Sequence, residues 1–91
     1  GFSLSQNYPN PFNPSTKIKF QIPASSTRRT DKVLLTIYDN LGREVTVLVN
    51  EYKSPGYYTV LFDGSNLPGG VYYYFIKAGS FIDSKRMIII K

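Results

Sequence analysis

The chain has no cysteine and no histidine among its 91 residues. It can therefore form no disulfide, thiolate zinc site or cysteine nucleophile, and it lacks the commonest general base and metal ligand. The acidic residues fall mostly at expected turns, where carboxylates accept local backbone N–H groups. A calcium site at Asp39 or Asp63 would need a dense acidic loop, and neither residue has one. We expect no enzyme activity, no metal and no cofactor.

Long apolar runs are also missing. The longest, VYYYFI over residues 71–76, is far shorter than the ~20 residues of a membrane helix, so we expect no membrane insertion. The start, GFSLSQ, does not resemble a signal peptide, and an exported chain would carry its export signal elsewhere in a longer precursor. The formal net charge of +5 favours acidic partners. Nucleic acid is not expected among them, because the tyrosines at 72–74 alternate between faces and form no aromatic stripe.

Short segments with alternating apolar and polar residues dominate the chain. In KIKFQI, Ile18, Phe20 and Ile22 point one way and the polar residues the other, which indicates a half-buried strand. Residues 71–78 are apolar on both faces, as in a central strand. The pattern predicts a single all-β domain, an antiparallel Ig-like β-sandwich of about seven strands, one of them from the N-terminal segment. The other expected strands are residues 17–22, 32–39, 44–49, 57–62, 71–78 and 81–90.

Residues 6–14, QNYPNPFNP, form what we call the opening segment. Its three prolines fix their own φ and push the preceding residues toward extended geometry. A strand hydrogen-bonded within a sheet could not include these prolines, because proline has no backbone N–H to donate, and a flexible linker would not need Phe12. We expect a stiff segment whose rings, Tyr8 and Phe12, plug one edge of the sandwich. A docking motif for an aromatic groove is the alternative, although the proline spacing does not favour it.

Four stretches of the chain resemble the C-terminal sorting domains of type IX secretion. The resemblance runs from about Leu4 to Lys91. LSQNYPNPFNPSTKIKF resembles the family's opening motif, and IYDNLGREVTVLV its central hairpin. LPGGVYYYFI contains the Gly-x-Tyr motif, and KRMIIIK has the lysine–apolar–lysine pattern of the terminal motif.

The resemblance implies a signal that acts on a passenger protein N-terminal to it. The type IX outer-membrane translocon and its shuttle protein would recognise the folded domain, and a sortase would cut near or upstream of Gly1, Phe2 and Ser3. The passenger would cross the periplasm and be released or attached to the cell surface. Residues 1–5 would be a linker remnant and residues 6–91 the sorting domain. The recognition residues it implies are Gly70, Tyr72, Lys85, Met87, Ile89, Ile90 and Lys91. The structural motif positions are Tyr8, Pro9, Pro11, Phe12, Gly42 and Gly69.

Two questions stay open at the level of sequence. The last strand is apolar on both faces, so its edge is either covered within the domain or paired with a partner strand. A different function is also open: an Ig-like adhesion or carbohydrate-binding module, with Tyr57, Tyr72 and Tyr74 as candidate glycan contacts, or a self-assembling cap domain. A sugar site would require these tyrosines to share a face.

Overall fold

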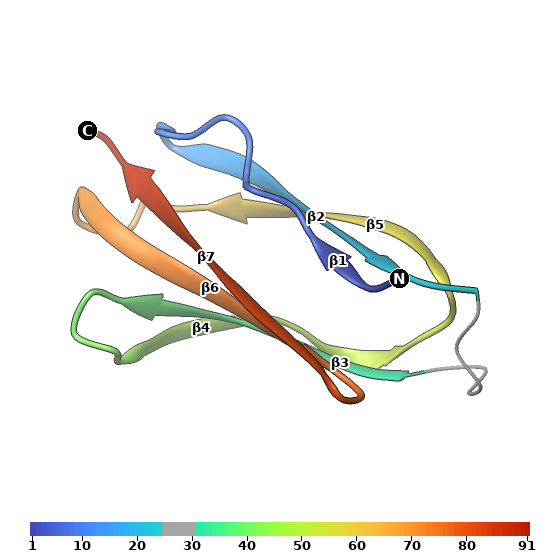
Figure 1. The fold of residues 1–91 in the computed structure, drawn as a ribbon. Helices are drawn as coiled ribbons and strands as arrows, with labels where there is room; N and C mark the ends of the chain where they lie inside the picture. Colours follow the sequence, from blue (N-terminus) through green and yellow to red (C-terminus); the bar gives the residue numbers. More distant parts are fainter. Residues whose placement is uncertain (25–30) are drawn as a thin grey trace.

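The computed structural model describes residues 1–24 and 31–91. The described chain contains seven strands in two sheets, with strand orders β1-β2-β5 and β4-β3-β6-β7, and every strand pair is antiparallel. The prediction of an all-β antiparallel sandwich is confirmed (Figure 1). The strands are β1 (Ser3–Leu4), β2 (Ser15–Ile22), β3 (Asp31–Asp39), β4 (Glu44–Lys53), β5 (Gly56–Asp63), β6 (Gly70–Ala78) and β7 (Phe81–Ile89).

The period-two pattern determines which side chains face inward. On β2, Ile18, Phe20 and Ile22 are buried, while Lys17 and Lys19 are exposed. Inward side chains from both sheets form one core, because neither sheet can bury its apolar face alone. The buried apolar residues of this core are Leu4, Phe12, Ile18, Phe20, Ile22, Val33, Leu35, Ile37, Val49, Phe62, Tyr72, Tyr74, Ile76, Ala78, Met87 and Ile89.

Strand β6 lies between β3 and β7, as its two apolar faces predicted. It pairs with β7 along its whole length, from Gly70 opposite Ile89 to Ala78 opposite Phe81. Strand β7 is therefore hydrogen-bonded to β6 on one side, and it is the outermost named strand of its sheet. The other edge of β7 is either covered by another part of the domain or left exposed, and the sequence alone did not decide between the two.

Several strands differ from the predicted ranges by one or two residues; for example, β2 begins at Ser15 rather than Lys17, and β7 ends at Ile89 rather than Ile90. Strand β4 continues to Lys53 rather than Val49, and its pairing with β3 has register shifts at Leu35/Thr36 and Ile37/Tyr38. The N-terminal strand is only the pair Ser3–Leu4, which lies antiparallel to β2.

Several loops and the C-terminus gather at one end of the sandwich. In Figure 1 the C-terminus, the turn of the opening segment, the β3–β4 hairpin and the β5–β6 connection lie together at the left of the view. The N-terminus lies away from this end. We call this the C-terminal end of the sandwich, and it contains most of the residues that the family resemblance pointed to.

Candidate functional site

The opening segment covers the free edge of β7 along residues 86–90. Its side chains and backbone take the place that a neighbouring strand would occupy, and Phe12 forms a parallel bridge with Ile89. Along residues 86–90, the edge is therefore covered within the domain. The hydrogen bonds are Gln6 Nε2 to Arg86 O (2.7 Å), Ile88 N to Asn10 Oδ1 (3.0 Å), Phe12 N to Ile88 O (3.0 Å) and Ile90 N to Phe12 O (2.9 Å).

Phe12 fixes this covering segment to the core. Its side chain is only 1% exposed, and its ring meets Phe62 edge-on with centroids 6.1 Å apart. The expectation that Phe12 plugs an edge is confirmed. The same expectation for Tyr8 is wrong, because Tyr8 is 81% exposed and only its backbone is bound, in a bridge to Lys17. The prolines restrict the backbone but do not decide which ring turns inward.

A buried polar network holds the start of the opening segment. Asn7 is 2% exposed; its backbone N–H donates to the Tyr74 hydroxyl (2.7 Å), and its side-chain amide donates to Thr16 Oγ1 and Pro9 O (both 3.1 Å). The Tyr74 hydroxyl donates in turn to Ser5 O (2.6 Å). Burial raises the pKa of Tyr74 to about 12, because the low-dielectric interior disfavours the phenolate. Since Thr16 is on β2 and Tyr74 on β6, this network ties the segment to both sheets.

The residues of the terminal motif divide into buried and exposed groups. Met87 and Ile89 are 0% and 1% exposed, so in the folded domain they offer no surface to a partner. Ile90 is 50% exposed, and Lys85 is half-buried. The Lys91 ammonium donates to the carbonyl oxygens of Ser65 (2.9 Å) and Gly64 (3.3 Å), which fastens the chain end to the β5–β6 connection.

Two glycines let the terminal strand pass close to the β5–β6 connection. A Cβ on Gly69 would lie 3.3 Å from both Ile89 O and Lys91 Cγ. A Cβ on Gly64 would lie 2.9 Å from Ile89 Cδ1, closer than real Cβ contacts come. The resemblance pointed to Gly69, whereas Gly64 was missed because only its packing against Ile89 reveals the need for glycine.

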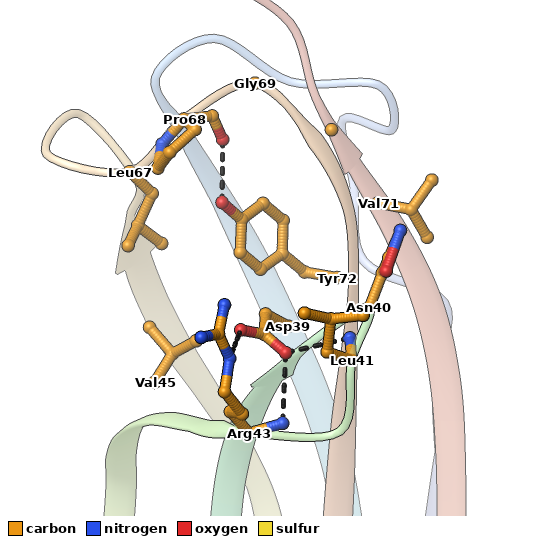
Figure 2. Close-up of a pocket in the computed structure, with 11 residues that line it drawn as sticks. Asp39, Asn40, Leu41, Arg43, Val45, Leu67, Pro68, Gly69, Val71 and Tyr72 are labelled. Carbon is orange, nitrogen blue, oxygen red and sulfur yellow. Dashed lines mark hydrogen bonds and ion pairs between the residues drawn. The ribbon is translucent and has the colours of Figure 1, made fainter.

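The central hairpin and the Gly-x-Tyr motif face each other across a cleft of about 340 Å³. Figure 2 shows the Tyr72 ring between Pro68 and the Asp39–Arg43 pair. Tyr72 is 6% exposed and donates its hydroxyl hydrogen to Pro68 O (2.7 Å), which fixes the turn before β6. In the turn of the central hairpin, Gly42 has φ +83°, a conformation that favours glycine.

The carboxylates at two turns accept hydrogen bonds from the local backbone, as expected. Asp39 accepts from Leu41 N (2.9 Å), Arg43 N (3.0 Å) and Arg43 Nε (2.8 Å). The backbone N–H of Arg43, with its guanidinium and Leu41 N–H, holds the pKa of Asp39 below its usual value. Asp63 accepts from Ser65 N (2.9 Å), and this bond lowers the pKa of Asp63.

The predicted cleavage region lies where the chain enters the sheet. Gly1 is exposed, the Phe2 ring stacks on Phe81 with centroids 5.3 Å apart, and Ser3 pairs with Gln21. Leu4 is buried in the core. Part of the segment that we interpreted as a linker remnant is therefore built into the fold.

The tyrosines proposed for a glycan site do not share a face. Tyr57 is 83% exposed on β5, whereas Tyr72 and Tyr74 are buried between the sheets. This arrangement gives no aromatic row of the kind that the carbohydrate-binding alternative required.

Comparison with known proteins identifies the family. Residues 6–91 match the family model of the secretion system C-terminal sorting domain. The chain therefore belongs to this family of type IX secretion sorting domains, which is not a catalytic family. No curated protein matches the chain, and no solved structure does. Within residues 1–24 and 31–91, the structure has no helix long and apolar enough to cross a membrane.

Proposed function

We propose that this domain is the folded signal that the type IX outer-membrane translocon and its shuttle protein read at the C-terminal end of the sandwich. Family membership supports a C-terminal sorting signal for export to the cell surface or extracellular space. The observation that carries the finer proposal is the contact between the opening segment and β7. It joins two motifs that are about eighty residues apart into one rigid surface.

In this proposal the buried motif residues position the exposed ones. Met87 and Ile89 anchor the terminal strand in the core, and Gly69 permits its close passage. Ile90 and Lys91 then leave the core in a defined direction, and Ile90 offers an apolar side chain that is half exposed. A preformed surface loses less conformational entropy on binding than a flexible tail would, which favours recognition of the folded domain.

The position of the N-terminus suits a passenger that precedes the domain. In Figure 1 the N-terminus lies away from the C-terminal end of the sandwich, so a passenger attached to it would not cover the recognition surface. We infer that the passenger passes through the periplasm with this domain attached. A sortase then cuts the linker, and the passenger is released or attached to the cell surface.

The fold also limits where a sortase can cut. Proteases act on extended, accessible backbone, and the backbone of Ser3 and Leu4 is already paired with β2. We therefore place the cut before Ser3, at Gly1–Phe2 or upstream.

A fusion experiment tests the proposal. Residues 1–91 are placed behind a signal peptide and a fluorescent passenger, in a host with type IX secretion and in the same host without its translocon. Export that depends on the translocon is expected. Passenger that stays in the periplasm of the competent host would refute the sorting function.

A pair of surface variants tests the recognition surface. Ile90→Glu changes an exposed side chain of the C-terminal end, and Leu61→Glu is its control, because Leu61 is 65% exposed on β5. We expect Ile90→Glu to lower export at least about tenfold, the equivalent of ~1.4 kcal/mol of binding, and Leu61→Glu to export normally. Equal export of the two variants would contradict a role for Ile90.

A further inference from the structure

The cleft between the β3–β4 hairpin and the turn before β6 is built from two rigid walls. The Asp39 carboxylate binds the hairpin backbone at Leu41 and Arg43 and also holds the Arg43 side chain. The Tyr72 hydroxyl holds the opposite wall at Pro68. A cleft that is already formed requires little reorganisation to accept a ligand.

The lining of the cleft is mainly apolar with one cation at its rim. Leu41 is 75% exposed at the rim of the cleft, and Val45, Leu67 and Val71 are half-buried along its walls. The Arg43 side chain is 73% exposed, and Asp39 is bound to its Nε (2.8 Å). Because the Arg43 side chain is this exposed, a ligand carboxylate can reach the guanidinium N–H groups other than Nε.

The cleft is continuous with the recognition surface proposed above. Gly69 lines the cleft and also lies against Ile89 O and Lys91 Cγ on the terminal strand. A partner bound at Ile90 and Lys91 would therefore meet the cleft entrance at Gly69.

We propose that this cleft binds a protein segment of the secretion machinery in which an apolar side chain is followed by a carboxylate. The apolar side chain enters between Leu41 and Leu67, and the carboxylate pairs with Arg43. The charge of the domain favours an acidic partner over a second copy, because each copy carries a formal net charge of +5. This inference rests on the sorting function, and it adds a second contact point to that function.

A matched pair of leucines provides the test. Leu41→Glu places a negative charge at the cleft rim, and Leu61→Glu makes the same change on β5 at a leucine of similar exposure, 75% against 65%. Both substitutions keep the backbone bonds, so both purified domains should retain the wild-type melting temperature. In the fusion assay, Leu41→Glu should slow export at least about tenfold, whereas Leu61→Glu should export at the wild-type rate.

Crosslinking in living cells gives a second readout. A photoreactive amino acid at position 41 of the otherwise unchanged fusion should form an adduct with a type IX component, at a peptide that contains Asp or Glu. The same group at position 61 should not form this adduct.

The outcomes separate the two proposals. Failure of the wild-type fusion to leave the periplasm would overturn the sorting function. If the wild-type fusion is exported and Leu41→Glu is exported normally, only the proposal about the cleft is overturned. Equal slowing of both leucine variants would also overturn only that proposal. A crosslink from position 41 to a second copy of the domain would also overturn it.

Discussion

Replacing Phe12 by alanine should detach the opening segment from the core. The side chain is 1% exposed and contacts Phe62, so the substitution removes an aromatic plug between the segment and the sandwich. An aromatic side chain buries about 150–250 Å², which at about 25 cal/mol per Å² gives an upper limit of roughly 4–6 kcal/mol. Measured Phe→Ala changes in cores cost about 3–5 kcal/mol, and we expect a loss in this range.

Urea unfolding of the purified domain measures this loss. A domain of this length has a total stability of roughly 5–14 kcal/mol, so the variant should unfold at a much lower urea concentration. Tyr8→Ala is the control in the same segment, because that ring is 81% exposed, and its change should stay within about 0.5 kcal/mol. A Phe12→Ala loss below about 1 kcal/mol, or one equal to that of Tyr8→Ala, would refute the account of the opening segment.

The buried network, the close approach at Gly64 and the hairpin turn give three further predictions. Tyr74→Phe leaves the buried Asn7 N–H and the Ser5 carbonyl without their partner and should cost about 1–3 kcal/mol in urea unfolding. Because burial raises the pKa of Tyr74 to about 12, the folded state holds this proton more tightly than the unfolded chain. Stability should therefore fall as pH rises from about 10 toward 12; a Tyr74→Phe variant with the same slope as wild type would contradict this. Gly64→Ala should cost about 1–3 kcal/mol, because its Cβ must displace the buried Ile89 side chain, and an unchanged melting temperature would argue against the close approach. The Asp39 carboxyl should titrate by NMR with a pKa below 3.8, the ordinary value for an aspartate. The stability that its hairpin contacts contribute should therefore be present above pH 3.8 and be lost as the pH falls through the lowered pKa. A titration midpoint at or above 3.8 would contradict the hydrogen bonding.

The sequence predicted the strands well, because their burial follows a local rule. Alternating residues such as Ile18 and Phe20 face the core in any sandwich, and no distant contact is needed to infer this. Strand β4 was predicted too short because the polar, exposed Asn50 and Glu51 end its run of apolar residues, whereas pairing with β3 continues to Lys53. Strand β1 has only two residues and therefore no period to detect.

The candidate site depended on contacts that no local pattern contains. Asn10 accepts a hydrogen bond from Ile88, 78 positions away, and the sequence gives no sign of which strand edge the opening segment covers. The need for glycine at position 64 is likewise set by the Ile89 side chain. The resemblance located the motifs, but their pairing in space came from the structure.

The four sequence motifs contact one another in two pairs. The opening motif contacts the terminal motif, and the central hairpin faces the Gly-x-Tyr motif. The first pair covers the edge of the terminal strand along residues 86–90, and the second forms the cleft. All four meet at the C-terminal end of the sandwich, away from where a passenger would attach.

The central claim is that export requires the joined surface of the opening segment and β7, and not stability alone. The direct measurement is the exported fraction of the passenger fused to Phe12→Ala, compared with Ile76→Ala, a core variant on β6 that is 1% exposed and expected to lose a similar ~2–5 kcal/mol. Both are assayed at a temperature where unfolding of the purified domains shows equal folded fractions. We predict that Ile76→Ala is exported and Phe12→Ala is retained in the periplasm. Equal export of the two variants would contradict the claim.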